Sequence, residues 1–404
     1  MKILILTTSF PRSISDTSGK FIKDQIQNLR KYYEWIDFIV LIPHDKNSKK
    51  VYLSKDYKLK YFHYFFTNRF ETLTTGDIKQ NLQKNFFNYF LIPFFFIFQI
   101  ISTYKTCRLE KPDLIYAHWF TTQAISAYVV SKLLSIPYVI TSHSSDVKFL
   151  NNKIPILGKK IIKKVCLSAK SISVTSNNTR KLLESNFEID EIQNMNINTI
   201  PMGLNSDEID STELEEVSIN DGINILFIGR FIEIKGIEIL INSFKQISEN
   251  YGKINLLIAG YGQDAKKYKN MVSELNLEDK VNFLGRVNES QKKFLFNKVD
   301  LLVIPSITSK DGYVEGLPVV ILEGMYSGTV CIASSYTNAE DIIDDGVNGF
   351  ILNEVNVSSL SKKIRNVLDL DAKSLDSIKK NSAERAKEFN SKNSAVQFYD
   401  NLLS

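Results

Sequence analysis

The sequence predicts an α/β protein with two doubly wound, Rossmann-like domains facing each other across a cleft. Short apolar runs typical of buried strands recur along the chain, segments with helical periodicity lie between them, and the whole alternation occurs twice. Alternating strands and helices imply right-handed crossovers and a parallel sheet covered on both faces. Ligands of such sheets bind outside the carboxyl ends of the strands, so the cleft between the domains is the expected site.

The first series of elements fills the N-terminal half of the chain. Its expected strands are Ile3–Leu6, Phe38–Ile42, Leu114–Ala117, Tyr138–Thr141 and Ile172–Thr175. Its expected helices are Phe21–Tyr33, Asn85–Arg108, Gln123–Leu134 and Ile156–Ser168. The most apolar stretch, Tyr89–Phe98, is interrupted by Pro93 and is well short of the ~20 apolar residues of a membrane-spanning helix. We therefore expect a buried or interfacial helix there and no transmembrane helix.

The second series follows an acidic, strand-poor stretch. Its expected strands are Ile223–Ile228, Ile254–Ala259, Val281–Leu284, Leu301–Ile304 and Val330–Ala333. Its expected helices lie near Ile237–Asn250, Asp264–Leu275, Glu289–Asn297 and Pro318–Tyr326. The predicted organisation is an N-terminal domain over 1–204, a linker over 205–221, a C-terminal domain over 222–385, and a terminal helix over 386–404 that packs back on the N-terminal domain.

Composition indicates a soluble globular protein. Of the 404 residues, 24% are charged and 44% hydrophobic, and the net charge of +5 suits an anionic ligand or membrane surface. No long basic run suggests a nucleic-acid partner. Cys107, Cys166 and Cys331 stand far apart and form no CxxC pair, and the N-terminal apolar run is too short for a signal peptide. A reducing cytoplasm is the expected location.

The stretch EGLPVVILE is the most informative part of the chain. Pro318 is expected to open a helix, which places Glu315 in the loop before it and Glu323 on its second turn. Unpaired N–H groups at a helix N-terminus bind anions, and two carboxylates around an anion pocket suit a ligand that carries both hydroxyls and phosphates, such as a sugar nucleotide. The residues expected to border the ligand are Gly316, Leu317, Val319 and Val320. The alternative is a buried turn before an ordinary apolar helix, with both glutamates solvated.

Cations follow the first strand of the second series. Gly229 ends this strand, and Arg230 and Lys235 lie in the loop after it, where they would neutralise a diphosphate. The alternative is that both are exposed loop cations. The next two strands end in glycine turns that contain Gly260 and precede Arg286, and such turns let a base or ribose approach the backbone.

These motifs occur in a recognisable order. The runs GRFIEIKG, AGYGQD, FLGRV, PSITSKDGYVEGLPVVILEGM and NAEDIIDDGVNGFIL, preceded by TTSFPR, DLIYAHWFTTQA and IPYVITSHSSDV, cover nearly the whole chain. In this order they resemble glycosyltransferase family 4, whose members are retaining transferases with the GT-B fold.

The resemblance implies roles for the donor residues. Arg230 and Lys235 would hold the diphosphate of a UDP- or GDP-sugar, Glu315 would face the transferred sugar, and Glu323 would accept hydrogen bonds from the ribose. Gly19, in the loop after the first strand, would let the backbone approach the phosphates. No cofactor other than this substrate is implied. One departure is a glycine after Glu323, where the family usually has alanine, and it should weaken that helix by roughly 1 kcal/mol.

The resemblance also assigns the histidines. His143 would lie beside the donor sugar at the reacting centre with Asp146 nearby, and His118 would lie closer to the acceptor. Each histidine follows a strand-like run, so either is alternatively a core-edge residue bonded to a backbone carbonyl. The other two, His44 and His63, occupy polar surroundings, and we expect them to be surface residues and poor candidates.

The implied reaction is transfer of a sugar from a nucleotide donor to a hydroxyl of a glycan or lipid-linked saccharide, with retention and without a metal. The DxD sequence at 369–371 is expected to be a solvated face. Alternatives are a GT-B nucleotide-sugar epimerase, a phosphorylase, or a non-catalytic protein that binds nucleotide sugars or glycans.

A membrane contact is a further expectation. Lysines recur beside apolar residues at helical spacing, at positions Lys159, Lys160, Lys163 and Lys164. This pattern fits a helix that lies on an anionic membrane, and it equally fits a surface helix whose apolar face is in the core. The first reading predicts a cytoplasmic enzyme, peripheral on the inner face of the cell membrane, that acts in the synthesis of a bacterial capsule, exopolysaccharide or lipopolysaccharide.

Overall fold

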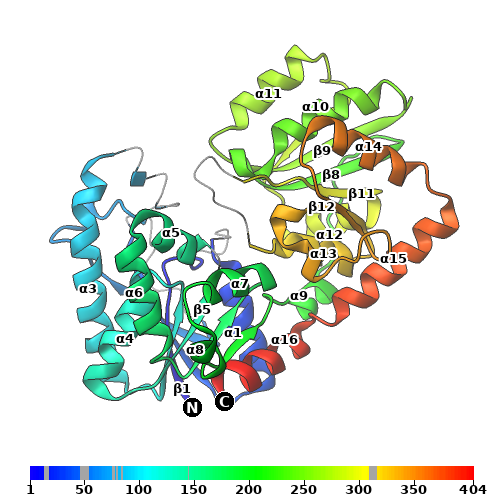
Figure 1. The fold of residues 1–404 in the computed structure, drawn as a ribbon. Helices are drawn as coiled ribbons and strands as arrows, with labels where there is room; N and C mark the ends of the chain where they lie inside the picture. Colours follow the sequence, from blue (N-terminus) through cyan, green and yellow to red (C-terminus); the bar gives the residue numbers. More distant parts are fainter. Residues whose placement is uncertain are drawn as a thin grey trace. The chain divides into compact units, whose positions relative to one another are not determined.

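The protein divides into two compact units, each with one parallel sheet (Figure 1). The computed structural model describes residues 1–12, 18–45, 54–74, 78, 81–82, 85–143, 145–308 and 316–404. The first unit comprises Met1–Met202 and Lys392–Ser404, and the second comprises Gly203–Ser391. The predicted α/β class and the two parallel sheets are confirmed.

The first unit contains a seven-stranded parallel sheet in the order β3-β2-β1-β4-β5-β6-β7. The strands are β1 Lys2–Leu6, β2 Asp37–Pro43, β3 Tyr57–Phe62, β4 Leu114–His118, β5 Tyr138–Ser142, β6 Ser171–Val174 and β7 Ile197–Thr199. Their apolar runs are buried because helices cover both faces, as parallel sheets require. The strand order reverses between β1 and β4, and this is the point where doubly wound sheets bind ligands.

Helices flank this sheet on both sides. They are α1 Lys20–Tyr32, α3 Phe87–Glu110, α4 Thr122–Leu134, α5 Ser145–Lys153, α6 Pro155–Cys166, α7 Asn177–Glu184 and α8 Ile189–Gln193, with a 3-10 turn η1 at Asn68–Phe70. Figure 1 shows α3, α4 and α6 on one side of the sheet and α1 on the other. The lysine-rich helix α6 buries Ile162, Val165 and Cys166, so its apolar face is in the core. Lys163 pairs with Glu191 at 2.6 Å.

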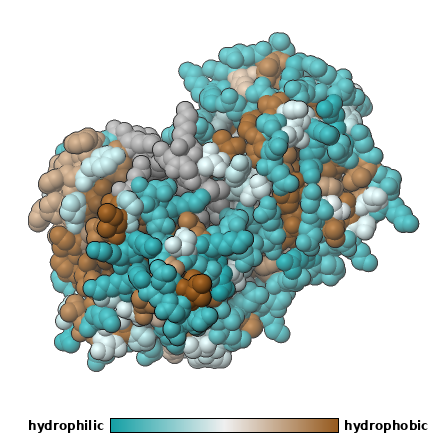
Figure 2. Space-filling model, in the orientation of Figure 1, coloured by the Kyte–Doolittle hydropathy of each residue, from teal (hydrophilic) through white to brown (hydrophobic). Residues whose placement is uncertain are grey.

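Helix α3 is long and apolar enough, by length and composition, to cross a bilayer. Here it packs beside α4 and buries a stripe that is partly polar and includes Leu91, Phe95, Gln99 and Thr103. Its other side is exposed and rich in aromatic residues, and Figure 2 shows hydrophobic residues gathered over it. Helix α3 is therefore only partly buried and longer than the apolar stretch suggested, and its placement at a membrane interface stays a prediction.

The second unit contains a six-stranded parallel sheet in the order β10-β9-β8-β11-β12-β13. The strands are β8 Ile223–Arg230, β9 Ile254–Tyr261, β10 Val281–Gly285, β11 Leu301–Ile304, β12 Val330–Ser334 and β13 Phe350–Leu352. The helices are α9 Ser206–Ser211, α10 Ile237–Ser248, α11 Ala265–Glu274, α12 Glu289–Lys298, α13 Val319–Tyr326, α14 Val357–Leu368 and α15 Ala372–Lys387. Short 3-10 turns are η2 Glu233–Lys235, η3 Ser335–Thr337 and η4 Ala339–Asp341.

The stretch predicted as a linker, 205–221, belongs to the second unit. The Asn205 side chain caps α9 by accepting a hydrogen bond from the Glu208 N–H. Further along, Val217 and Ile219 pack against the core of this unit. The apolar residues scattered among the acidic ones therefore anchor the segment, and it is not a free connector.

The C-terminal residues belong to the first unit. Helix α16 (Ser391–Phe398) continues into a π-helical turn, η5 (Tyr399–Leu403). The Tyr399 ring stacks on Tyr33 with 4.1 Å between centroids, and the Ser171 hydroxyl donates to the Asn401 carbonyl at 3.0 Å. The terminal segment is thus tied to both α1 and β6.

Candidate functional site

Three residues lie at the carboxyl ends of β8, β9 and β10. Arg230 and Arg286 were predicted from the sequence as ligand-binding residues, and Tyr261 was not. Arg230 ends β8 and is in register with Tyr261, which ends β9. The Arg286 guanidinium follows β10 and lies over the Tyr261 ring, 3.5 Å from its centroid. This cation–π stack forms a flat, partly exposed platform at the ligand-binding edge of the sheet.

The predicted glycines at this edge are required by packing. Gly260 has a φ of 138°, and a Cβ there would stand 1.8 Å from the Gly229 carbonyl oxygen. The ends of β8 and β9 therefore approach too closely for any side chain. Whatever these glycines do for a ligand, they first allow the two strand ends to meet.

The loop after β8 is joined to the loop after β11. Lys235 lies in η2 and is only 8% exposed. The next residue, Gly236, has a φ of 66°, and a Cβ there would stand 1.9 Å from the Pro305 carbonyl oxygen. The Ile307 N–H donates to the Ile234 carbonyl at 2.8 Å. The loop that carries Lys235 is thus fixed beside Pro305 and Ile307, in the segment that directly follows β11.

Helix α13 begins as predicted, with Pro318 as its N-cap and Glu323 on its second turn. The predicted ligand-bordering residues Gly316, Leu317, Val319 and Val320 are half-buried. Glu315 lies outside the described residues.

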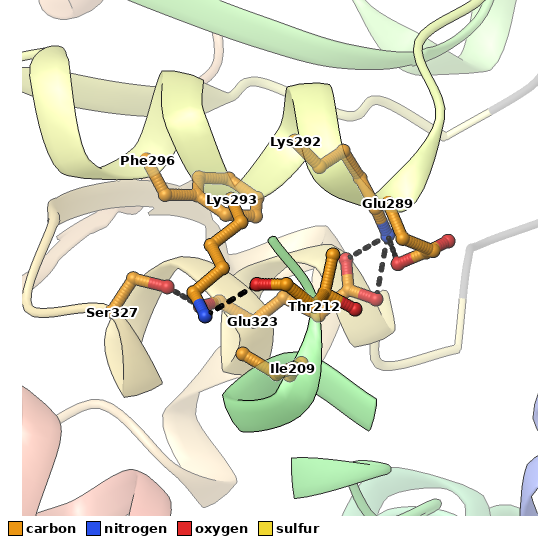
Figure 3. Close-up of a pocket in the computed structure, with 8 residues that line it drawn as sticks. All are labelled: Ile209, Thr212, Glu289, Lys292, Lys293, Phe296, Glu323 and Ser327. Atoms are coloured by element: carbon orange, nitrogen blue, oxygen red, sulfur yellow. Dashed lines mark hydrogen bonds and ion pairs between the residues drawn. The ribbon is translucent and has the colours of Figure 1, made fainter. Parts of the chain in front are cut away.

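Glu323 is held by a lysine that sequence reasoning missed. Both Glu323 oxygens accept from the Lys292 Nζ at 2.8 Å, and Glu289 lies 3.0 Å from the same nitrogen. Burial lowers the pKa of Lys292, but the carboxylates of Glu323 and Glu289 outweigh it, so the pKa is raised. Figure 3 shows the three side chains meeting beside a small pocket that Ile209 and Thr212 also line. The spacing of Glu289 and Lys292 indicates an ion pair on one helix face, but gives no signal for the contact with Glu323.

The glycine after Glu323 also has a packing reason. A Cβ on Gly324 would stand 2.6 Å from Leu302 Cδ2 and 3.3 Å from Cys331 Sγ. Helix α13 lies so close to β11 and β12 that alanine, usual in the family, has no room. Its cost in helix propensity is offset by this close packing.

In the first unit the structure brings the two predicted histidines together. His118 ends β4, His143 follows β5, and His118 Nδ1 lies 3.1 Å from His143 Nε2. Their rings stack, and the Trp119 ring lies 4.6 Å from that of His143 between centroids. Trp119 has a φ of 74°, which is rare for a bulky residue and is found where surrounding structure imposes strain.

Both imidazoles are neutral at physiological pH. Burial, and then the neighbouring His143, lowers the pKa of His118 well below its usual value. Burial lowers the pKa of His143 to about 3. In the described part of the chain, His118 Nε2 is buried without a hydrogen-bond partner.

Asp146 lies beside the histidines and holds their loops in place. It accepts hydrogen bonds from the Phe120 N–H at 2.7 Å and from the Ser142 hydroxyl at 3.0 Å. It is 3% exposed, and burial raises the pKa of its carboxyl group. Asp146 therefore ties the loop after β4 to the end of β5, which makes it a positioning residue.

Gly19 is the N-cap of α1 and lies close to the pair His118 and His143. Its φ is 66°, and a Cβ there would stand 2.2 Å from the Ser9 carbonyl oxygen. Two residues later, the Phe21 ring lies 5.3 Å from that of His143 between centroids. The predicted phosphate loop and the predicted reacting centre are thus neighbours in the first unit.

The DxD sequence has structural partners. Asp369 accepts from the Tyr251 hydroxyl at 2.7 Å, and Asp371 caps α15 by accepting from the Ser374 N–H at 2.9 Å.

Two family models match most of the chain. Glycosyltransferase Family 4 matches residues 61–208, and Glycosyl transferases group 1 matches residues 211–385. The chain is a family 4 glycosyltransferase. Its two units are those of the GT-B fold.

Similar proteins agree with this assignment. The transferase is 29% identical to an uncharacterized glycosyltransferase of Methanocaldococcus jannaschii, over 80% of this chain and 85% of that protein. It is 26% identical to a putative teichuronic acid biosynthesis glycosyltransferase of Bacillus subtilis, over 80% and 78%. The structure of HepE from Anabaena in complex with UDP matches 98% of both chains with a TM-score of 0.71 and 18% identity.

The neutral histidines predict a pH dependence of stability. A histidine whose folded pKa is depressed contributes stability that is present above the pKa of free imidazole and lost as pH falls toward the folded value. Between about pH 7 and pH 4.5, the free energy of unfolding should fall by about 2 kcal/mol less in His143→Gln than in the wild type. The raised pKa of Asp146 changes stability with pH in the opposite direction, but this contribution is the same in both proteins. Urea unfolding followed by fluorescence of Trp35 and Trp119, both in the first unit, measures this, and equal losses would contradict it.

The ion pair at Glu323 predicts a stability difference between neighbouring lysines. Lys292→Met leaves a largely buried carboxylate without its cation and should lower the free energy of unfolding by roughly 3 kcal/mol. Lys293→Met is the matched control, because Lys293 Nζ donates only to the carbonyls of Asp210 and Thr212 among the described residues. Adding Glu323→Gln to Lys292→Met should restore part of the loss. Calorimetry of the four proteins tests this, and equal effects of the two lysine changes would refute it.

Proposed function

We propose that the transferase moves a sugar from a nucleotide-sugar donor, a UDP- or GDP-sugar, to a hydroxyl of a glycan or lipid-linked saccharide with retention at the anomeric carbon. The observation that carries the proposal is the joined pair of loops in the second unit. The Ile307–Ile234 hydrogen bond fixes the loop of Arg230 and Lys235 beside the segment that directly follows β11. HepE, with the same fold, was solved with UDP, which favours a nucleotide donor here.

The proposed donor chemistry is electrostatic. As the sugar departs, negative charge develops on the diphosphate, and fixed cations and N–H groups lower the energy of that transition state. Arg230 and Lys235 supply the cations, and the first N–H groups of α13, at Val319 and Val320, supply a helix N-terminus. This assignment needs no metal ion at the reacting centre.

Separate residues recognise the rest of the donor. Both Glu323 oxygens accept from the Lys292 ammonium group, and each carboxylate oxygen has a further lone pair that is suited to accept from a ribose hydroxyl. The Arg286–Tyr261 platform offers a surface for the base. Glu315 is assigned to the transferred sugar on the family motif.

The histidine pair is assigned to the reacting centre in the first unit. A neutral His143 offers a hydrogen bond to a sugar hydroxyl without adding a charge. His118 orients the His143 ring through the 3.1 Å contact between their ring nitrogens. We assign His118 and Asp146 to the acceptor side. Asp146 acts there by shaping the loops.

The exposed face of the first unit supports a lipid-linked acceptor. Aromatic and aliphatic side chains at least 38% exposed gather on α3 and the preceding turn, at Phe66, Phe70, Phe86, Tyr89, Phe90, Ile97, Ile101 and Tyr104. We call these the α3 patch. Exposed lysines of α6 lie on the same side of the sheet (Figures 1 and 2). A cytoplasmic enzyme peripheral on the inner face of the cell membrane, acting on a lipid-linked glycan of a surface polysaccharide, accounts for both.

Loss of either cation should sharply lower turnover without unfolding the protein. We expect Arg230→Ala and Lys235→Ala to lower kcat by about 10²–10³-fold because the leaving group loses a fixed charge. Lys298→Ala, an exposed lysine of the same unit, is the control and should keep wild-type kcat. UDP- and GDP-sugars are first screened by thermal shift, and transfer is then followed by NMR of the product anomer. Near-normal turnover in either variant, or an inverted product, would overturn the assignment.

Vesicle binding tests the membrane contact. Wild-type protein should co-sediment with anionic vesicles more than with neutral ones, because lysines near such a surface contribute about 1 kcal/mol each. The double variant Phe66→Ser/Phe90→Ser should bind several-fold more weakly, since it removes two exposed rings of the α3 patch. Ile189→Ser, a 77% exposed residue on α8, is the matched control. No preference for anionic lipid, or equal binding of the two variants, would remove the membrane part of the proposal.

A further inference from the structure

Two histidines lie side by side at the carboxyl ends of β2 and β3. Pro43 and Phe62 end these strands in register, and the His44 N–H donates to the Phe62 carbonyl at 2.8 Å. The rings of His44 and His63 are 4.4 Å apart between centroids. The expectation that both are ordinary surface residues is wrong for His44, whose side chain is 17% exposed, whereas that of His63 is 51% exposed.

A fully buried carboxylate lies against both rings. Glu71 is 0% exposed, and its Oε2 is 2.5 Å from His44 Nδ1 and 3.0 Å from His63 Nδ1. The other oxygen, Oε1, accepts from the N–H groups of Tyr64 at 2.6 Å and Phe65 at 3.2 Å. Two backbone donors thus fix the direction of the carboxylate and aim its second oxygen at the imidazoles, as neighbouring hydrogen bonds do for metal ligands.

Glu71 meets no lysine or arginine side chain among the described residues. In the described part of the chain, the ion-pair partners of Glu71 are these two imidazoles. A buried carboxylate is costly without a compensating positive charge. A divalent cation bound by the same three side chains supplies that charge.

The donor set is one that zinc uses. Two imidazoles and one carboxylate form three-residue zinc sites in which the remaining position stays open. One ligand atom from each of the three residues lies within 4.8 Å of the others. Zinc at about 2.0–2.1 Å from each donor separates them by roughly 3.3 Å, so the present contacts need only a small expansion. His63, being half exposed, has the freedom to make it.

We propose that His44, His63 and Glu71 bind one divalent transition-metal ion of the zinc class, through the Nδ1 atoms and Oε2. The open position lies on the exposed side next to His63 and takes a water molecule. The ion clips the segment that follows η1 to the ends of β2 and β3. The site is separate from the residues assigned to sugar transfer, so its success or failure leaves the proposed activity untouched.

Metal binding to tag-free protein tests the proposal. After treatment with a chelator and its removal, the wild type should bind one Zn²⁺ per chain in calorimetry, and Co²⁺ should give the visible absorption of a four-coordinate site. His63→Gln should weaken the binding of Zn²⁺ and of Co²⁺ by at least tenfold, because it removes one of three ligands. The half-exposed position of His63 means that the change has little effect on folding. Glu71→Gln should do the same if it folds. His143→Gln, the same change at another histidine of this unit, should keep wild-type affinity.

Melting temperature gives an independent readout. At one fixed Zn²⁺ concentration, the melting temperature of the wild type and of His143→Gln should rise clearly and that of His63→Gln should rise much less, because stabilisation by a bound metal falls with its affinity for the folded cluster. Absence of Zn²⁺ binding by the wild type, or undiminished affinity in His63→Gln, would overturn the proposal.

Discussion

Close backbone contact at the carboxyl ends of parallel strands is the constraint on which both units depend. At Gly19, Gly236 and Gly260 the φ angle is positive, and an added Cβ would stand 1.8–2.2 Å from a carbonyl oxygen of a neighbouring segment. No side-chain rearrangement relieves a clash with backbone, so these positions admit only glycine. Each of them lies next to residues assigned to function: Gly19 near His143, Gly236 directly after Lys235, and Gly260 beside the end of β8 that carries Arg230.

Electrostatics divides the candidate residues into two kinds. In the second unit, charge is retained and paired, since Lys292 holds both oxygens of Glu323. In the first unit, burial removes charge from the histidine pair. A diphosphate needs fixed positive charge, whereas an oxocarbenium-like sugar is better served by neutral hydrogen-bonding groups, which do not repel it. The two environments match the two halves of the proposed donor.

The sequence predicted central elements better than edges and long-range contacts. All ten expected strands exist; nine lie inside a sheet, where a strand buried on both faces is a short apolar run, and the tenth, β10, is an edge strand. The strands that were missed, β3, β7 and β13, each lie at the edge of a sheet, and β3 reads YKLKYF, with only its first and last residues buried. The start of α13 followed from Pro318, but Lys292 reaches Glu323 from another helix, and nothing local indicates that contact. The acidic stretch 205–221 read as a linker because its few apolar anchors are widely spaced.

The missed edge strand also hid the histidine cluster. His44 follows a predicted strand, but His63 comes beside it only through the register of β3. That register is fixed from both faces, because Tyr57 packs edge-on against Phe10 and Phe62 packs against Phe95, at opposite ends of the strand. A slip by one residue would turn both rings out of their contacts and move His63 to the other face. Two buried aromatic rings therefore determine whether His44 and His63 meet, and with them whether Glu71 has partners.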